Sequence, residues 1–174
     1  MGMTQARPAD LDASAGHARR AIVRTASSEE TRALGAALAA VAERGDRLAL
    51  IGPLGAGKTQ LAKGVASGLG VEGVVNSPTF VLMNEHVGRL RLFHVDAYRL
   101  GDPEEALAAG LLDDRAAGGV VVIEWADRLD GWLPDDRLDV QIDPVEGEPS
   151  SRLLRWTAHG SDHAQLATAM EPEP

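Results

Sequence analysis

The chain has 174 residues and a formal net charge of −9, from 17 lysines and arginines against 26 aspartates and glutamates. This length is sufficient for one domain with a sizeable core, and the absence of cysteine excludes disulfides, thiolate catalysis and cysteine-ligated zinc. Only two lysines are present, Lys58 and Lys63, and an acidic chain with so little lysine is not expected to bind tRNA or DNA tightly by itself.

The first segment, residues 1–20, is polar and is predicted to be a disordered leader. It lacks the apolar core of a secretory signal peptide, and no apolar run in the chain approaches the length of a membrane span. We therefore expect a cytoplasmic protein without a membrane segment.

A strand and a helix are predicted next. Residues 21–24 read as a short strand, and Ser27 and Glu30 have the spacing of a capping box at the start of a helix. Apolar residues then recur every three or four positions on one face, and Gly45 is predicted to end this helix.

The segment Gly52–Thr59, GPLGAGKT, fits the phosphate-binding loop pattern GxxxxGK[ST]. The mostly apolar run 47–51 precedes it and has the length of a buried strand. Leucine and valine residues follow it every four positions, as on one face of a helix, and Gly70 is a plausible stop. Strand, glycine loop and helix are the context that the motif requires.

The chemistry of such a loop explains its spacing. Gly55 and Gly57 let the backbone curl so that N–H groups point at phosphate oxygens, and the helix adds its positive end. Lys58 would reach the β- and γ-phosphates, and the Thr59 hydroxyl would bind magnesium. The nucleotide-contacting residues expected around the loop are Leu54, Gly55, Ala56, Gly57, Lys58, Thr59 and Gln60.

Several strands and one short helix are predicted after the loop unit. A loop at 76–80 enters a strand at 81–83, and residues 89–96 alternate as a second strand. Asp102 and Pro103 begin a short helix, as cap and first-turn residue. The β-branched apolar run 120–123 fits an interior strand of a parallel sheet covered on both faces.

The C-terminal part is predicted to contain an antiparallel pair of strands, 138–142 and 152–158, around a turn at 147–151. Residues 159–174 are predicted to be a flexible tail. The expected fold is a single α/β P-loop domain over residues 21–158, with a mainly parallel sheet flanked by helices.

Two carboxylates are candidates for the acidic residue that a magnesium-dependent nucleotide enzyme needs. Glu124 follows the apolar strand 120–123 and could hold magnesium or its water; a solvated carboxylate at a strand end is the alternative. Asp96, in HVDAYR, could order water and phosphate oxygens, or could form a surface ion pair, and spacing does not decide between them. Thr79 could sense the γ-phosphate, or lie in a simple Ser-Pro-Thr turn.

Four motifs occur in order, at 52–59, 77–80 (SPTF), 94–100 (HVDAYRL) and 123–125 (IEW). As an ordered set they resemble the bacterial TsaE (YjeE) family, the small ATPase of tRNA threonylcarbamoyladenosine (t6A) synthesis. The similarity extends over about residues 27–142.

The resemblance implies a compact P-loop fold with ATP and magnesium as ligands. It implies action with TsaD- and TsaB-like proteins, which carry out threonylcarbamoyl transfer, so that tRNA is met only through the complex. In the family, ATP hydrolysis supports this cycle and does not make the transferred group. ATPase activity is therefore expected to be weak without the partners.

The family's functional residues correspond to positions in this chain. Lys58 and Thr59 match its phosphate and magnesium positions, Asp96 its functionally important aspartate, and Glu124 its magnesium-linked glutamate. We therefore expect Lys58, Asp96 and Glu124 to be the catalytic residues and Thr59 and Glu124 to hold the metal. Ser28 lies where the family contacts the nucleotide before the first helix, which is a weaker match.

Three other functions are conceivable for a chain with a phosphate-binding loop. A GTPase needs an Asn/Thr-Lys-x-Asp motif after the magnesium strand, and no lysine follows Lys63. A P-loop small-molecule kinase normally carries an arginine-rich lid, whereas only Arg128 and Arg137 follow closely after Glu124. The third is a nucleotide-gated binding module with slow hydrolysis. It is not distinct from the function of the family that the chain resembles, because both act through partners.

Overall fold

The computed structural model describes residues 20–110, 118–160 and 164–170. The described strands form one sheet in the order β1-β7-β6-β2-β5-β4-β3. The strands are β1 (Arg20–Thr25), β2 (Arg47–Ile51), β3 (Met83–His86), β4 (Arg91–Asp96), β5 (Gly119–Glu124), β6 (Arg137–Val145) and β7 (Glu148–His159). The helices are α1 (Ser28–Val41), α2 (Lys58–Gly68), α3 (Pro103–Ala108), the short 3-10 helix η2 (Ala126–Leu129) and α4 (Ala164–Ala169).

The centre of the sheet is parallel, as predicted. Strand β2 pairs in parallel with β5 and β6, and β5 pairs in parallel with β4. Strands β1, β7 and β3 add antiparallel pairs toward the two edges. The expected single α/β domain, with an antiparallel pair near the C-terminus, is therefore confirmed. The predicted leader at 1–20 lies, except for Arg20 in β1, outside the described residues.

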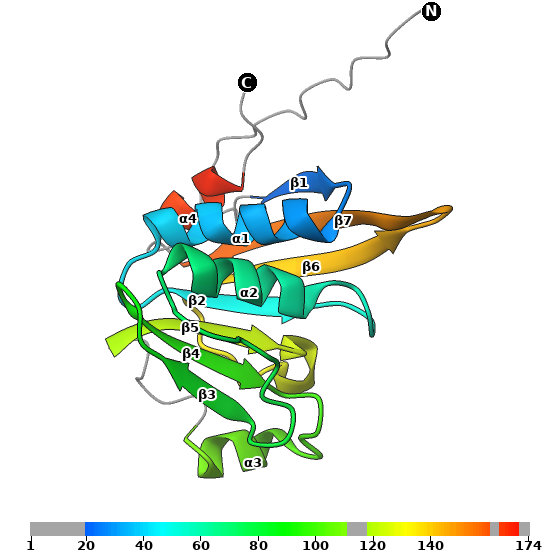
Figure 1. Cartoon of the computed structure of the whole chain (residues 1–174). Helices are drawn as coiled ribbons and strands as arrows, with labels where there is room; N and C mark the ends of the chain where they lie inside the picture. The colour runs from blue at the N-terminus through cyan, green and yellow to red at the C-terminus, as the bar shows by residue number, and fades with distance from the viewer. Residues whose placement is uncertain (1–19, 111–117, 161–163, 171–174) are drawn as a thin grey trace, which may run out of the picture.

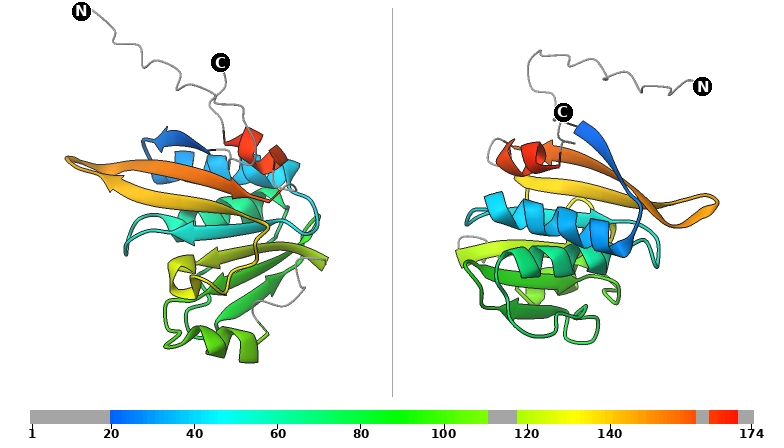
Figure 2. Two further views of the ribbon diagram at one scale, coloured as in Figure 1. Left: turned by 180° about the vertical axis from the view of Figure 1, so that it is seen from behind. Right: turned by 45° about the horizontal axis from the view of Figure 1, so that its top comes forward.

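Helices cover both faces of the sheet. Helices α1 and α2 lie side by side across one face, with α4 beside α1, while η2 and α3 lie on the other side (Figures 1 and 2). Successive side chains of β2 point to opposite faces of the sheet. Leu48 and Leu50 belong to the hydrophobic core under α1 and α2, and Ala49 belongs to a second hydrophobic core on the other face. All residues of β5 are buried, which confirms it as an interior strand.

The start of α1 follows its sequence signal, but its end does not. Ser27 is the N-cap and accepts a hydrogen bond from the Glu30 N–H at 3.1 Å, while the Glu30 carboxylate accepts from the Ala26 N–H. The helix ends at Val41, so the prediction that Gly45 ends it is wrong. The backbone is already extended at Ala42, and the left-handed Gly45 turns the chain toward β2 instead.

Helices α1 and α2 approach each other so closely that glycine is required between them. A Cβ atom on Gly64 would collide with the Arg32 backbone, and one on Gly35 with the Leu61 and Val65 backbones. These glycines hold α2, and with it the loop that precedes α2, at a fixed distance from α1.

Two turns differ from prediction. Strand β3 starts at Met83, because Val81 and Leu82 turn back and donate their N–H groups to the Pro78 carbonyl. The turn between β6 and β7 is tighter than 147–151: Val145 already pairs with Glu148, since Gly147 adopts φ of +76°.

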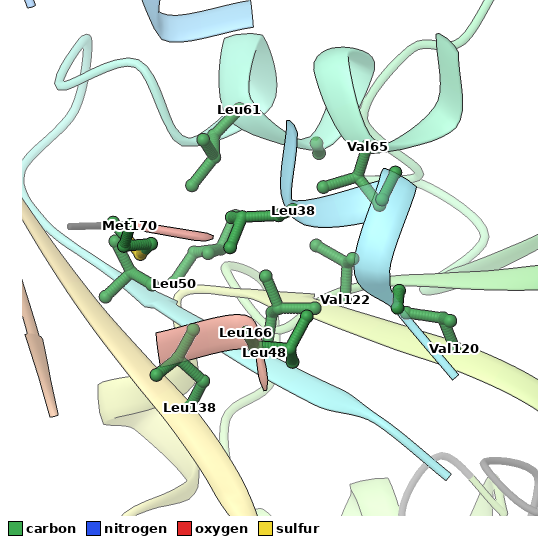
Figure 3. Packing of buried hydrophobic residues seen from close by; sticks show 14 of the residues in the cluster. Leu38, Leu48, Leu50, Leu61, Val65, Val120, Val122, Leu138, Leu166 and Met170 are labelled. Carbon is green, nitrogen blue, oxygen red and sulfur yellow. The ribbon is translucent and has the colours of Figure 1, made fainter. Parts of the chain in front are cut away.

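The expectation of a flexible tail at 159–174 does not hold for its central part. His159 is the last residue of β7, and α4 packs on α1 and β7. Leu166 and Ala167 on α4 are buried, and so is Met170 directly after the helix, because their spacing of one and three positions turns them to one side. Figure 3 shows Leu166 and Met170 among the core leucines.

None of the helices in the described ranges is long and apolar enough to cross a membrane.

Candidate nucleotide site

The predicted phosphate-binding loop connects β2 to α2 at the carboxyl end of the parallel strands, the edge where open α/β sheets bind ligands. Gly57 is the N-cap of α2 and has φ of +106°, and Gly55 has φ of +76°. Both conformations favour glycine, which explains the two residues in the motif. The strand–loop–helix context expected from the sequence is present.

A cavity of about 270 Å³ lies over this loop. It is lined by the loop, by the N-terminal part of α1, by the end of β5 and by β7. The lining residues are Ser28, Thr31, Leu54, Gly55, Ala56, Gly57, Lys58, Thr59, Gln60, Glu124, Trp125, Ser150 and Arg152. All the residues at positions 54–60 that were expected to contact the nucleotide therefore line the cavity, and so does Ser28. Thr79 and Asp96, which were also candidates, are not among its lining residues.

Lys58 is a buried cation at the base of the cavity. Its Nζ atom donates to the carbonyl oxygens of Gly52 and Pro53 at 2.7 and 2.9 Å, and lies 3.7 Å from the centre of the Trp125 ring. Burial lowers the pKa of this amine, and the negative charge of Glu124 partly opposes the shift. Since both hydrogen bonds are to neutral carbonyls, the charge remains available to an anion.

Thr59 and Glu124 meet at the centre of the site. The Thr59 hydroxyl donates to Glu124 Oε2 at 2.8 Å, because β5 lies next to β2 with Leu50 opposite Glu124. Glu124 is only 2% exposed, which excludes the alternative of a solvated carboxylate at a strand end. The structure thus places a carboxylate beside the hydroxyl that the motif assigns to magnesium.

His94 was not singled out from the sequence as a site residue, yet it contacts Glu124. Its Nε2 atom lies 2.7 Å from Glu124 Oε1, and its side chain has no exposed surface. The buried Nδ1 atom has no hydrogen-bond partner. A neutral ring with its proton on Nε2 satisfies the carboxylate, whereas a charged ring would bury an unpaired N–H group. The available signal was a histidine on the apolar face of β4.

Asp96 ends β4 directly beside Glu124 in the sheet register. Its Oδ2 accepts hydrogen bonds from the Ser77 hydroxyl and, at 2.8 Å, from the Thr79 hydroxyl, and its Oδ1 accepts from the Tyr98 N–H at 2.8 Å. Asp96 therefore anchors the loop that carries Thr79. At 2% exposure it forms no surface ion pair.

The charged residues of the HVDAYR segment do not form a single cluster. Arg99 lies over the Phe80 ring, 4.2 Å from its centre, whereas the Asp96 carboxylate accepts from Ser77, Thr79 and Tyr98. The arrangement at 94–99 thus divides into Asp96, which faces the loop at 77–79, and Arg99, which covers an exposed phenylalanine.

Trp125 forms the wall of the cavity above Lys58. It is one of two non-glycine residues with positive φ among those the structure describes, at +57°, and it precedes η2. Its ring packs on Tyr98 with centres 4.8 Å apart. A left-handed tryptophan is conformationally costly, and such strain occurs preferentially at functional sites.

Arg152 is a second site residue that sequence reasoning missed. It extends from β7 to the phosphate-binding loop and donates to the carbonyl oxygens of Ala56 at 2.8 Å and Gly55 at 3.2 Å. Nothing in its sequence position marks it, because the contact joins residues 96 and 97 positions apart in the chain.

Comparison with known proteins decides the family. The family model "Threonylcarbamoyl adenosine biosynthesis protein TsaE" matches residues 25–153, most of the chain. The chain belongs to the TsaE family.

The relatives support this membership over most of the chain. The tRNA threonylcarbamoyladenosine biosynthesis protein TsaE of Bacillus subtilis is 42% identical over 145 residues, 82% of this chain and 89% of that protein. The protein of the same name from Streptomyces coelicolor is 39% identical, over 74% of this chain and 89% of the relative.

A solved structure shows that the fold is shared as well. The crystal structure of Bacillus subtilis YdiB superimposes with a TM-score of 0.74 at 35% sequence identity. The match covers 90% of this chain and 97% of that one. The resemblance drawn from the four ordered motifs and the expected α/β fold are both confirmed.

Proposed function

We propose that this TsaE-family chain is a magnesium-dependent ATPase that supports tRNA t6A modification together with TsaD- and TsaB-like proteins. The observation that carries the proposal is the contact between Thr59 and Glu124 beside the buried Lys58. These are the hydroxyl, carboxylate and cation that a P-loop nucleotide site needs. Family membership supports the role in t6A biosynthesis.

ATP is the proposed nucleotide. The cavity brings the loop amides, Lys58 and the N-terminal end of α2 to one place, which suits a polyphosphate chain. No lysine follows Lys63 in the sequence, so the lysine-containing motif that recognises guanine is absent. We expect calorimetry to show tighter binding of ATP than of GTP; equal binding would contradict the choice of nucleotide.

The residues at the site fit magnesium. Thr59 and Glu124 offer hard oxygen donors, as this ion prefers. Among the described residues no group of three or more histidine, cysteine, aspartate or glutamate side chains could hold a metal alone. This composition suits magnesium, which normally takes one or two protein ligands and completes its shell with phosphate oxygens and water. When bound, the ion would neutralise charge on the β- and γ-phosphate oxygens.

The chain's own groups divide the remaining work. Lys58 and the loop amides hold the phosphates, and Glu124 orders the metal or its water. Asp96 holds Thr79, through their hydrogen bond, at the sheet edge where the γ-phosphate is expected. Carboxylates that act through ordered water or metal contribute mainly in the transition state, so hydrolysis depends on them more than binding does.

Partners rather than this chain are proposed to contact tRNA. The net charge of −9 disfavours autonomous binding to a polyanion. The protein is accordingly proposed to act in the cytoplasm as the ATP-consuming component of a complex.

The small-molecule kinase alternative gains no support from the structure. The two arginines that might have formed a lid already have partners: Arg128 lies 5.3 and 5.9 Å from the centres of the Tyr98 and Trp125 rings, and Arg137 pairs with Asp139. A screen of acceptor substrates becomes the next step only if the assay below fails.

Multiple-turnover threonylcarbamoylation tests the proposal, with TsaD, TsaB, the activated threonylcarbamoyl donor, tRNA and ATP. We expect Glu124→Ala and Asp96→Ala to keep much of the ATP affinity, to lose hydrolysis and to stop repeated rounds of modification. The matched control is Glu72→Ala, which removes an exposed carboxylate and should behave as the unaltered protein. Full modification without this protein, or with Glu124→Ala in its place, would reject the assigned role.

A further inference from the structure

The guanidinium of Arg152 has an unusual set of partners. Its Nε and Nη2 atoms donate to the loop carbonyls of Ala56 and Gly55, and its Nη1 atom donates to the carbonyls of Pro149 and Ser151, both at 2.7 Å. The side chain is half-buried and lines the cavity. It therefore connects the first residues of β7 with the phosphate-binding loop.

The number of donors leaves one hydrogen bond unassigned. A guanidinium has five N–H donors, and the four contacts above use four of them. The remaining donor is on Nη2, the nitrogen that contacts Gly55 in the loop. Arg152 can thus hold the loop and still donate to a ligand in the cavity.

The charge of Arg152 is not neutralised within the site. All four acceptors are neutral carbonyls, and no carboxylate in the described ranges forms a salt bridge with Arg152. Arg155, three residues further along the same strand, behaves differently and pairs with Asp143. A cation that lines a cavity without a carboxylate partner favours an anionic ligand there.

The contacts to the loop also act on its amides. A carbonyl that accepts a hydrogen bond polarises the N–H of the same peptide group. The Gly55 carbonyl shares its peptide group with the Ala56 N–H, and the Ala56 carbonyl shares its peptide group with the Gly57 N–H. The Ala56 N–H already donates to the Pro53 carbonyl at 3.1 Å. The Gly57 N–H is a loop group that would bind phosphate, so the Arg152 contact to Ala56 strengthens it as a donor while it fixes its direction.

We propose that Arg152 is a phosphate-binding residue of this site, which holds the anionic chain of a nucleoside polyphosphate from the β7 side while it fixes the loop. The proposal rests on the proposed binding of ATP. It adds to Lys58 a second cation that lines the cavity, contributed by a strand outside the P-loop motif. A planar fork of donors suits both tasks, whereas a lysine could supply only a point charge.

Calorimetry with ATP and with inorganic pyrophosphate tests the proposal on the full chain. Arg152→Gln keeps a polar side chain but removes the charge, and it should weaken both ligands about ten- to a hundredfold. Arg152→Lys should recover part of that loss. The matched control Arg155→Gln removes a cation from the same strand and should leave both affinities unchanged, because its pair is exposed. In unaltered protein, added salt should weaken pyrophosphate binding more steeply than in Arg152→Gln.

The outcomes separate this proposal from the proposed function. If Arg152→Gln and Arg152→Lys bind both ligands as the unaltered protein does, Arg152 does not bind phosphate, even though ATP binding itself stands. A lower unfolding temperature with unchanged affinities would assign Arg152 a purely structural role and also overturn the proposal. If the unaltered protein binds neither ligand, the proposed function fails first. If Arg152→Gln does not fold, Arg152→Lys tests the proposal. The affinity of Arg152→Lys for both ligands should then fall by less than a hundredfold but by more than that of Arg155→Gln, and an affinity equal to that of Arg155→Gln would overturn the proposal.

Discussion

His94 and Glu124 form a buried pair across neighbouring parallel strands, with 2.7 Å between His94 Nε2 and Glu124 Oε1. The other carboxylate oxygen accepts from Thr59. His94 therefore holds the carboxylate in the orientation in which it meets the hydroxyl, and it acts as a positioning residue.

Replacing His94 should affect both folding and metal binding. His94→Ala leaves a buried carboxylate oxygen without a donor, so the free energy of unfolding should fall by about 1–3 kcal/mol. Magnesium should also bind more weakly to the ATP-loaded protein, while His94→Gln, which keeps a donor, should recover part of both losses. Urea unfolding and magnesium titration measure the two effects. His86→Ala is the control, and equal behaviour of the two alanine variants would contradict the positioning role.

Removing the loop lysine should weaken ATP binding. Lys58→Ala deletes a charge-assisted phosphate contact worth about 1.5–3 kcal/mol, which corresponds to roughly ten- to a hundredfold in the dissociation constant. Lys63→Ala removes the other lysine of the chain, five positions away on α2, and should have little effect. Calorimetry with ATP compares them. Unchanged affinity and turnover in Lys58→Ala would count against the site.

The affinity for ATP should begin to fall at a lower pH than it would if Lys58 had the pKa of an exposed lysine. Burial lowers the pKa of Lys58, and only its charged form attracts phosphate. Affinity is therefore fully present below the lowered pKa of the free protein and is lost as the pH rises through it. Lys58→Arg stays protonated over this range, so its dissociation constant should vary less with pH. Parallel pH curves for the two proteins would show that Lys58 is not the titrating group.

Tryptophan emission should report nucleotide binding. The Trp125 ring lies 3.7 Å from Lys58 Nζ and lines the cavity, so a phosphate that draws Lys58 away changes the surroundings of the ring. Trp156 is 1% exposed in the core and should give a constant background. ATP with magnesium should shift the emission of the unaltered protein and of Trp132→Phe, but not that of Trp125→Phe. If the emission does not shift at saturating ligand, the end of β5 does not lie beside the nucleotide.

The contact between α1 and α2 offers a test of stability. In an ordinary helix, replacement of glycine by alanine is favourable by about 1 kcal/mol. Gly64→Ala should have the opposite sign, destabilising the fold by about 1–3 kcal/mol, because the new methyl group would collide with the Arg32 backbone. Ser67→Ala, on the exposed side of the same helix, should be neutral or slightly stabilising. Urea unfolding of both variants gives the answer, and a stabilised Gly64→Ala would mean that the helices are less closely packed.

The sequence alone determined the features whose evidence is local. The phosphate-binding loop, the cap at Ser27 and the buried strand 120–123 each depend on residues within one turn or one strand, and such patterns follow backbone conformation directly. Glu124 was found in the same way, because its position after an apolar strand implies the edge of a parallel sheet where the loop also lies.

Only the tertiary structure decided which residues complete the site. His94 looks like one more core position of an alternating strand until β4 lies beside β5, and Arg152 is an unremarkable strand arginine until β7 reaches the loop. Helix α4 is buried only because α1 and β7 provide a surface for it. Such contacts join residues that are distant in the chain, and their energy depends on side-chain burial and hydrogen bonding that exist only after the sheet has assembled.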